Sequence, residues 1–335
     1  MSAPIRLGLV GTGRVGCDVA RLAATRAGVE LVAACSRDPA HRGRDLGELA
    51  GMAALGVEVT PDAAGVLAAR PDVVLVATTS FLADVAADLE AVVRAGANAL
   101  CTAEEAACPW AVDEALADRL AAVAREHGVT ILGAGANPGF VFDALVLTVA
   151  GAGPDVRRIV VERRVNFSRF SANVLGRLGV GYSPEAFAAG VAERRIFGHL
   201  GFPESMRVVA HALGRRIESI DRRIEPILAE RACSAEHLDV PQGHTAGVRQ
   251  HYVARVDGDE WFLATLVGHV APDEAGIALR DTIEVSGTRT IGLTIDPGLD
   301  PQATSASVLV NSLRRLVAAE PGWVTVADLP PARPA

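Results

Sequence analysis

Two adjacent glutamates, Glu104 and Glu105, stand out in this chain of 335 residues as candidates for acid–base chemistry. They follow the apolar run that ends at Cys101, and the next residues, Ala106 and Ala107, supply no lysine. A carboxylate in this setting can take a proton from ammonia or a carbinolamine and then stabilise an iminium ion that accepts hydride. We expect Glu104 to be catalytic, with Glu105 as the second choice, because Glu104 lies nearer the end of the preceding strand.

A structural interpretation of the same pair stays open. Acidic residues are favoured in the first turn of a helix, where the helix dipole stabilises negative charge. In that case Glu104 and Glu105 only open the helix that follows them. We prefer the catalytic interpretation. Sugar and alcohol dehydrogenases of related architecture carry a Glu-Lys-Pro segment here, whose lysine helps move the alcohol proton. This chain has Glu-Glu-Ala-Ala instead, which is better matched to a cationic intermediate.

The glycine-rich segment that begins at Gly11 has the spacing of a dinucleotide-binding turn. The apolar run 5–10 ends there, and the following residues continue as a helix. In this motif the first glycine permits a tight turn, the second lets the backbone approach a pyrophosphate, and the third lets the helix pack against the strand. The phosphates then bind N–H groups at the positive end of that helix. We therefore expect a bound dinucleotide cofactor, contacted by Gly11, Thr12, Gly13, Arg14, Val15 and Gly16.

The end of the second expected strand indicates which nicotinamide cofactor fits. NAD-selective sites usually place an acidic residue there to bind the ribose hydroxyls. Here Ser36 and Arg37 occupy that point, and an arginine can bind a 2′-phosphate through two hydrogen bonds. We expect NADP(H) to be favoured, with NAD(H) also accepted because Asp38 can accept a hydrogen bond from a ribose. Alternatively, Arg37 is only a solvated loop residue.

The predicted strands and helices of the first domain indicate where the remaining cofactor contacts lie. Buried strands are predicted at 5–10, 29–35, 72–77, 97–102 and 129–133, and helices at 14–26, 42–51, 82–95 and 112–127. This alternation predicts an α/β fold with a doubly wound parallel (Rossmann) sheet. Ligands bind such sheets at the carboxyl ends of the strands. From the segments that follow the third and fifth of these strands, we expect Thr78, Thr79 and Asn137 to contact the cofactor.

After residue 150 the pattern changes to a second, α+β domain with a large, mainly antiparallel sheet. Strands are predicted at 156–167, 217–229, 251–257, 261–270, 282–286 and 291–295, and helices at 185–195 and 203–213. The segment 303–319 is predicted to be a long helix that returns to the first domain. We expect a dinucleotide-binding domain at 1–138, a substrate-binding and dimerisation domain at 139–302, and a returning C-terminal segment at 303–330.

The composition argues against several classes of protein. The net charge of −8 disfavours nucleic-acid and anionic-membrane partners. Five cysteines without regular spacing indicate reduced thiols, the N-terminus lacks a basic-then-apolar signal, and no apolar run is long enough to cross a membrane. We therefore expect a cytoplasmic protein. No metal site is expected, because His237, His244 and His251 are interpreted as surface-loop histidines.

Motifs along the whole chain resemble a known family. They are Gly11–Gly16, Ser36-Arg-Asp38 with Gly43–Gly47, Cys101–Glu105, Gly133–Phe140 with Asp143, and Pro321–Pro330. In these segments the chain is similar to the dihydrodipicolinate-reductase-like amine dehydrogenases, the group that includes 2,4-diaminopentanoate dehydrogenase. The resemblance implies NAD(P)-dependent oxidative deamination of an amine, reversible as reductive amination of a small ketone or keto acid with ammonia. It also implies that the first glutamate of the pair is the acid–base.

Three other functions compete with this one. True dihydrodipicolinate reductases are disfavoured, because their paired-histidine segment and lysine-containing substrate loop have no counterpart here. A hydroxyl dehydrogenase of the glucose–fructose oxidoreductase type would act on a sugar or polyol without ammonia, and the missing lysine beside Glu104 counts against it. A non-catalytic NADP-sensing protein would bind the cofactor without turnover.

The substrate pocket is only outlined by the sequence. Aromatic side chains near the expected site would exclude water around a small ketone, and an asparagine on the first strand of the second domain is a polar candidate. These pocket residues are Phe140, Phe142, Asn166, Phe167 and Phe170. A substrate carboxylate would need a cation, for which the candidates are Arg163, Arg169, Arg177 and His199.

The sheet of the second domain also predicts self-association. Helices cover one face of it, and the segments 217–229 and 261–270 carry apolar residues at alternating positions. An uncovered second face would then expose a large apolar patch. Pairing about a two-fold axis is the commonest way to bury such a patch. We therefore expect a homodimer joined through these sheets.

Overall fold

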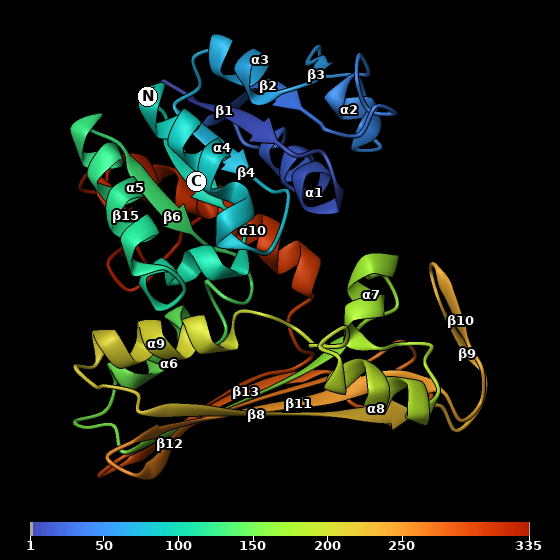
Figure 1. Cartoon of the computed structure of the whole chain (residues 1–335). Coiled ribbons are helices and arrows are strands. Elements are labelled where there is room, and N and C mark those ends of the chain that lie inside the picture. Colours follow the sequence, from blue (N-terminus) through green and yellow to red (C-terminus); the bar gives the residue numbers. More distant parts are fainter. Residues whose placement is uncertain (1–2, 335) are drawn as a thin grey trace. The chain divides into compact units, whose positions relative to one another are not determined.

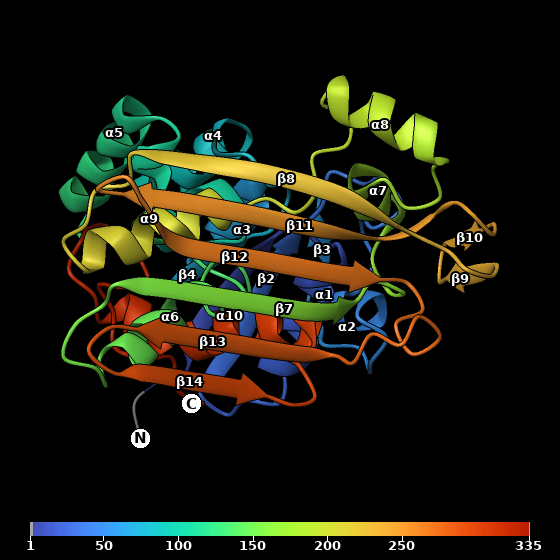
Figure 2. The ribbon, with the colours of Figure 1, turned by 90° about the horizontal axis from the view of Figure 1, so that it is seen from below.

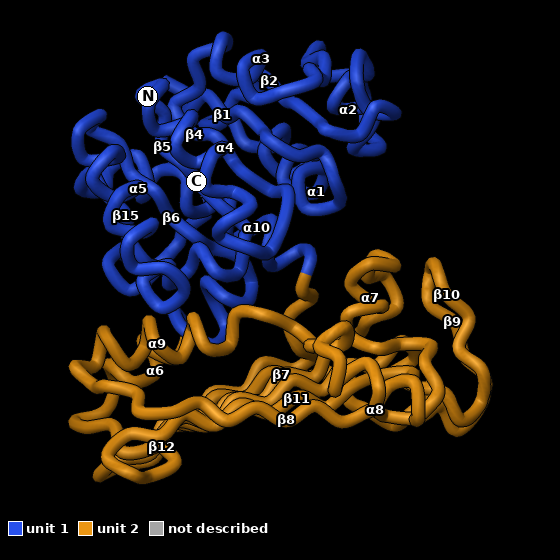
Figure 3. The backbone as a smooth tube through the Cα atoms, viewed as in Figure 1, with its two compact units in different colours: residues 1–144, 302–335 blue, residues 145–301 orange. Residues whose placement is uncertain are grey.

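The computed structural model describes residues 3–334, which form two compact units (Figure 3). The first unit extends to Ala144 and resumes at Gln302, and the second comprises Leu145–Pro301. The chain re-enters the first unit with helix α10 (Pro301–Val317). No helix within the described residues is long and apolar enough to span a membrane.

The first unit is built on a seven-stranded parallel sheet, most of whose strands are labelled in Figure 1. The strand order is β15-β6-β5-β4-β1-β2-β3, so β1 has β2 on one side and β4 on the other. This reversal of strand order defines a doubly wound sheet and confirms the predicted fold. The strands are β1 (Ile5–Val10), β2 (Val29–Cys35), β3 (Val59–Thr60), β4 (Val73–Val76), β5 (Asn98–Cys101), β6 (Thr130–Gly133) and β15 (Gly322–Val324).

Helices cover this sheet because its central strands are apolar on both faces. The strand β4 is Val-Val-Leu-Val and is buried throughout. Val66, Leu89 and Leu120, from three different helices, pack into one core with side chains of the sheet. The helices are α1 (Arg14–Ala23), α2 (Leu46–Leu49), α3 (Ala63–Ala68), α4 (Leu82–Arg94), α5 (Glu114–Glu126) and α10, with 3-10 turns η1 (Glu104–Ala107) and η2 (Pro109–Ala111).

One predicted helix is much shorter than expected. Of the segment 42–51, only α2 is helical, because Gly43 has a φ of +73° and the Asp45 carboxylate organises the loop around it. This carboxylate accepts hydrogen bonds of 2.7–3.1 Å from the backbone N–H groups of Gly47, Leu55, Gly56 and Val57. The bonds from Leu55, Gly47 and Gly56, that of Leu55 first, hold the pKa of Asp45 below its usual value. The loop therefore replaces two helical turns that the apolar pattern predicted.

The second unit is built on a six-stranded sheet in the order β14-β13-β7-β12-β11-β8. Among the described strands, β7 and β12 pair in parallel and the other neighbours are antiparallel, which confirms the predicted mainly antiparallel sheet. Its strands are β7 (Arg158–Asn166), β8 (Ser219–Leu228), β11 (Thr245–Val256), β12 (Asp259–His269), β13 (Arg280–Ser286) and β14 (Thr290–Ile295). A separate hairpin joins β9 (Cys233–Ala235) and β10 (Leu238–Val240).

The helices of this unit lie on one face of the sheet. Figure 1 shows α6 (Ala144–Ala150), α7 (Ala172–Leu178) and α9 (Phe202–Ala212) on the same side, with α8 (Pro184–Ala192) beside the edge strand β8. On this covered face Phe202 stacks on Tyr252 of β11, with ring centroids 4.8 Å apart. Figure 2 looks onto the opposite face, which the helices leave bare.

The bare face carries mixed side chains instead of the broad apolar patch that the sequence suggested. A hollow of about 460 Å³ on this face is lined by both charged and apolar residues, among them Glu162, Arg164, Arg249, His251 and Val267. Arg164 pairs with Glu162 at 2.6 Å. Successive side chains along a strand thus alternate between the buried, apolar face of the sheet and its bare face, which carries both charged and apolar residues.

Candidate active site and cofactor pocket

A cavity of about 370 Å³ lies at the carboxyl ends of β1, β2 and β4 in the first unit. Because the strand order reverses at β1, this is the place where doubly wound sheets bind nucleotides. The loops after these strands form its walls, together with residues of α3 and α4. The lining consists of Val10, Gly11, Thr12, Gly13, Cys35, Ser36, Arg37, Asp38, His41, Pro61, Asp62, Ala63, Ala77, Thr78 and Asp88.

The three glycines of the first turn are required for different reasons. Gly11 has a φ of +108°, and a side chain there would collide with the carbonyl oxygen of Ala77. A side chain on Gly16 would collide with the carbonyl oxygen of Gly11, so this glycine lets α1 approach the turn. A Cβ on Gly13, by contrast, would meet no described atom within 4 Å. Gly13 therefore leaves open space in which a ligand fits.

The helix α1 starts at that open space. Its N-cap residue is Gly13, no side chain of the described residues caps it, and its first turn contains no acidic residue. The first N–H groups of a helix have no partner within the helix, and the helix dipole is positive at this end. Arg14 and Val15 form this first turn, with Nη1 of Arg14 3.5 Å from Oε1 of Gln302. These residues fit the pyrophosphate of a dinucleotide.

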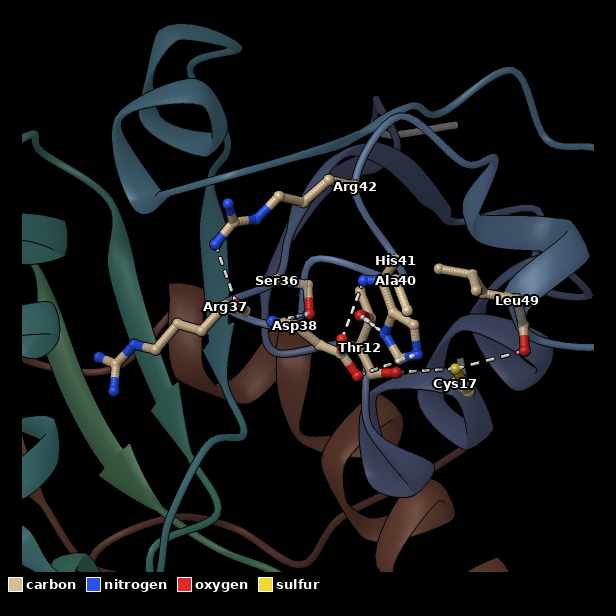
Figure 4. A network of polar contacts seen from close by, with 9 residues as sticks. All are labelled: Thr12, Cys17, Ser36, Arg37, Asp38, Ala40, His41, Arg42 and Leu49. Atoms are coloured by element: carbon tan, nitrogen blue, oxygen red, sulfur yellow. Dashed lines mark hydrogen bonds and ion pairs between the residues drawn. The ribbon is translucent and has the colours of Figure 1, made fainter.

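A network of polar contacts holds the wall formed by the β1 and β2 loops (Figure 4). Thr12 is buried, and its Oγ1 lies 2.8 Å from Nδ1 of His41. Ser36 Oγ accepts a hydrogen bond of 3.2 Å from the backbone N–H of Asp38, whose carboxylate accepts one of 2.9 Å from Ala40. The expected contacts Thr12 and Ser36 are therefore brought together. His41 joins them without having been predicted, because its segment gave no strand or glycine signal.

The Arg37 side chain extends away from this network (Figure 4). Its Nη2 lies 3.0 Å from Oδ2 of Asp88 on α4, where the two side chains form an ion pair. Arg42 instead donates a hydrogen bond of 2.9 Å to the backbone oxygen of Arg37. In the lining of the cavity, Arg37 is accompanied by three carboxylates, those of Asp38, Asp62 and Asp88. Arg37, which we expected to bind the 2′-phosphate, therefore lines the cavity and is paired with the carboxylate of Asp88.

Of the two threonines after β4, one reaches the cavity. Thr78 belongs to its lining. Thr79 donates a hydrogen bond of 3.1 Å to Oδ2 of Asp84, and its Oγ1 lies 3.5 Å from the backbone nitrogen of Phe81. The Thr79 hydroxyl is therefore used at the start of α4, and Thr78 is the better placed of the two for a cofactor contact.

Glu104 and Glu105 have different surroundings at the end of β5. Oε2 of Glu105 accepts a hydrogen bond of 2.7 Å from the backbone N–H of Leu82, which caps the first turn of α4. Glu104 begins the short turn η1. Burial raises the pKa of the neighbouring Cys101 thiol to about 12, and the charge of Glu104 contributes to this rise. The pair opens a single 3-10 turn instead of a full helix, which weakens the helix-opening interpretation.

Asn137 lies in the turn after β6, and its peptide bond to Pro138 is cis. Both polar atoms of its side-chain amide are buried, and neither has a hydrogen-bond partner among residues 3–334. Buried amides without partners are rare because each unmade hydrogen bond is costly. The turn itself is well held, since the backbone N–H of Gly139 donates a hydrogen bond of 2.7 Å to Asp143. The unpaired amide is therefore a group that a ligand would satisfy.

The aromatic residues expected to line a substrate pocket lie in different environments. Phe142 is fully buried in the first unit, and Phe167 is fully buried in the second, so both belong to hydrophobic cores. Phe140 is half-buried in the turn before α6. Phe170 is also half-buried and packs against Phe167, with ring centroids 4.8 Å apart. Phe140 and Phe170 are the two whose rings keep an accessible surface.

Two polar candidates of the second unit make structural contacts. Arg163 is buried, with its Nε 2.9 Å from Oδ1 of Asp281 and its Nη2 donating a hydrogen bond of 2.9 Å to the carbonyl of Leu299. Arg163 is therefore occupied and does not suit a substrate carboxylate. Oδ1 of Asn166 accepts a hydrogen bond of 2.8 Å from the backbone N–H of Ser168, at the end of β7.

Within the described residues, no group of three histidine, cysteine, aspartate or glutamate side chains is arranged to hold a metal ion. His251 lies on strand β11 and not in a surface loop, with its Nδ1 2.9 Å from Oγ1 of Thr265. Nδ1 of His244 lies 2.9 Å from the carbonyl oxygen of Gly181. His244 and His251 therefore make structural contacts within the second unit.

Two family models match the chain. Residues 140–334 match the 2,4-diaminopentanoate dehydrogenase C-terminal domain, and residues 5–101 match the dihydrodipicolinate reductase N-terminus. The first match covers more than half of the chain, so the chain belongs to the family defined by the 2,4-diaminopentanoate dehydrogenase C-terminal domain. The resemblance predicted from the motifs is confirmed.

Individual relatives are similar over nearly the whole length. The 2,4-diaminopentanoate dehydrogenase of Acetoanaerobium sticklandii is 28% identical, over 97% of this chain and 93% of that protein. An amine dehydrogenase of Streptomyces virginiae is also 28% identical, over 96% and 94% of the two chains. The structure of an amine dehydrogenase from Mycobacterium smegmatis matches with a TM-score of 0.87 at 26% identity, covering 99% of this chain and 97% of that one.

Proposed function

We propose that this protein is a nicotinamide-dependent amine dehydrogenase that reversibly aminates a small ketone or keto acid with ammonia, an oxidoreductase acting on CH–NH2 donors. Its family and the names of its relatives support this function. The observation that carries the proposal is the placement of two adjacent carboxylates at the end of β5. Glu105 caps α4, and Glu104 begins the adjacent turn, in a chain that contains no lysine at any position.

The absence of lysine argues against the hydroxyl dehydrogenase alternative. Hydroxyl dehydrogenases of related architecture use a lysine beside this glutamate to help move the alcohol proton. All 32 residues counted as lysine or arginine are arginines here. Arginine stays protonated at any ordinary pH, so it cannot exchange a proton during turnover. A carboxylate is therefore the better supported acid–base.

Glu104 would perform the proton chemistry of the proposed reaction. Its carboxylate takes a proton from ammonium, and the ammonia that is released adds to the ketone to give a carbinolamine. The protonated Glu104 then returns the proton to the hydroxyl, water leaves, and an iminium cation forms. The Glu104 carboxylate stabilises this cation by its opposite charge. A nicotinamide held in the cavity would supply the hydride for reduction of this cation, and the reverse sequence would deaminate the amine.

The cofactor proposed is NADP(H), with NAD(H) also accepted. The open space at Gly13 and the uncapped start of α1 suit the pyrophosphate. Ser36 and Arg37 suit a 2′-phosphate, whereas the carboxylates of the lining moderate that preference. The amide of Asn137 offers one donor group and one acceptor, which match the carboxamide of a nicotinamide.

The proposal also includes a homodimer joined through the bare face of the second-unit sheet. The helices of the chain's own second unit cover the other face and leave this one exposed (Figure 2). Apolar residues such as Val267 lie on it among the charged ones. An amphipathic face of this kind suits a subunit interface with a polar rim.

The test of the proposed function is a cofactor-oxidation screen of small ketones and keto acids in ammonium buffer, with an ammonium-free control for each. We expect oxidation only when a ketone and ammonium are both present. Turnover with a sugar or hydroxyketone in the absence of ammonium would favour the hydroxyl dehydrogenase instead. Tight cofactor binding without turnover on any compound would favour a sensor.

A further inference from the structure

We propose that Asp88 sets the preference between NADP(H) and NAD(H) by competing with the 2′-phosphate for the guanidinium of Arg37. The inference rests on the proposed function only in requiring that a nicotinamide nucleotide occupies the cavity. Asp88 is then a positioning residue, because it acts on the cofactor through Arg37.

The Arg37–Asp88 pair joins two sides of the cavity. Arg37 follows β2, Asp88 belongs to the helix after β4, and β1 lies between these two strands in the sheet. Both residues line the same cavity, and their charged atoms are 3.0 Å apart. The Arg37 side chain is 71% exposed and that of Asp88 only 18%. Asp88 is therefore the fixed partner, and Arg37 is the side chain that can move.

Arg37 has a second position within reach. Its neighbour Ser36 marks the end of β2, where a doubly wound sheet places the adenosine ribose. The groups around that point are held by hydrogen bonds, whereas the Arg37 guanidinium is turned away from them (Figure 4). Arg42 holds the backbone carbonyl of Arg37 at 2.9 Å. Rotation of the Arg37 side chain would thus bring its charge to a 2′-phosphate while the backbone stays in place.

The charges of the cavity lining make the affinity for NADP(H) depend on this competition for Arg37. A single arginine, Arg37, accompanies Asp38, Asp62 and Asp88 in the lining of the cavity. A 2′-phosphate entering this pocket meets three carboxylates and must draw Arg37 from one of them. NAD(H) carries no such phosphate and leaves the ion pair intact. Removing the charge of Asp88 therefore releases Arg37 for NADP(H) and changes little for NAD(H).

Asp62 provides a matched control in the same cavity. Its carboxylate accepts a hydrogen bond of 3.3 Å from the backbone N–H of Gly65 and caps α3. Asparagine is an equally good helix cap, so Asp62→Asn removes one negative charge from the lining and keeps the helix start. It does not break the Arg37–Asp88 pair. Comparison of Asp88→Asn with Asp62→Asn separates the release of Arg37 from a general change of charge.

The experiment is calorimetric titration of the full-length protein with NADPH and with NADH, which needs no turnover. An exposed ion pair of this kind is weak, so Asp88→Asn should tighten NADPH binding by roughly 2- to 5-fold and leave NADH binding unchanged. Asp62→Asn should give a clearly smaller shift. Arg37→Ala should weaken NADPH binding by about 10- to 150-fold, the worth of a charge-assisted hydrogen bond. In that background Asp88→Asn should change NADPH binding no more than Asp62→Asn does.

Three results would overturn the inference while the proposed function stands. They are an unchanged ratio of NADPH to NADH affinity in Asp88→Asn, an equal shift in Asp62→Asn, and an undiminished effect of Asp88→Asn in the absence of Arg37. Failure of the unmodified protein to bind either nucleotide would overturn the proposed function together with the inference.

Discussion

The carboxylate of Glu105 lies 2.7 Å from the backbone nitrogen of Leu82, the first residue of α4. The residue before this helix is Phe81, whose side chain cannot accept a hydrogen bond. A helix start leaves several N–H groups without partners, and a side chain from elsewhere in the fold can supply the missing acceptor. Glu105 therefore has a structural role at the start of α4.

The Glu105→Ala substitution removes this acceptor. We expect it to lower the free energy of unfolding by about 0.5–2 kcal/mol, the usual cost of losing a helix cap. Glu105→Gln keeps an oxygen acceptor and should cost less. Urea unfolding followed by circular dichroism measures both. Equal stability of the alanine variant and the unmodified protein would contradict the capping role.

At the scale of elements, one buried ion pair joins three segments of the second unit. Arg163 of β7 and Asp281 of β13 face each other, and their side chains are 3% and 0% exposed. The backbone of Leu299 binds both of them, donating a hydrogen bond of 2.8 Å to Asp281 and accepting one of 2.9 Å from Arg163. The pair thus fixes the segment that leads from β14 towards α10.

Breaking this pair from one side should be costly. Asp281→Ala leaves the Arg163 charge buried without its partner, and we expect a loss of about 3–5 kcal/mol in the free energy of unfolding. Replacing both residues with apolar ones, Arg163→Met with Asp281→Leu, should cost much less because no charge stays buried. Denaturant titration of the single and double variants tests this. A loss below about 1 kcal/mol in Asp281→Ala would show that water reaches the pair.

The sequence predicted the elements whose side chains repeat regularly. The strands at 29–35 and 261–270 have apolar residues at the expected spacing and were found, as was the glycine turn of the first unit. The hairpin β9–β10 and the helix α7 were missed because they are too short to show a period. The start of β11 was missed as well. At Gly247 the backbone of this strand lies so close to the carbonyl oxygen of Gly268 that a side chain would collide with it. This contact can be seen only in the folded sheet.

Part of the candidate site could be predicted because its residues form a regular local pattern in the sequence. Gly11, Gly13 and Gly16 follow one another in the chain, so their spacing alone indicates a phosphate site. The partners of Arg37 and Arg163 are 51 and 118 residues away in sequence. Such pairs depend on the order of strands in each sheet, which the local pattern does not contain. Whether a charged residue binds ligand or another side chain was therefore open before the fold was known.

At the scale of the whole molecule, the second-unit sheet has one face that the helices of its own unit leave bare (Figure 2). Leu263 of β12 lies on this face, because its neighbours Phe262 and Ala264 point into the covered one and are buried. A second copy of the chain that packs here would bury Leu263 near the middle of the interface.

The Leu263→Glu substitution places a charge at that point. In light scattering at micromolar concentration, we expect the unmodified protein to have twice the chain mass of 34.8 kDa and the variant to approach the single-chain mass. Val112→Glu, at an exposed position of the first unit, is the matched control and should leave the mass unchanged. A mass of 34.8 kDa for the unmodified protein would refute the dimer.

The most direct test of the acid–base role of Glu104 compares Glu104→Gln with Glu105→Gln in ammonium-dependent reduction of the best ketone substrate. If Glu104 moves the proton, Glu104→Gln should lose about 10²–10⁴ in kcat, the usual contribution of a positioned acid–base. Its affinity for the cofactor, measured by calorimetry, should stay unchanged, and Glu105→Gln should keep near-normal turnover. Near-normal kcat in Glu104→Gln, or an equal loss in both variants, would contradict the assignment of the catalytic carboxylate to Glu104.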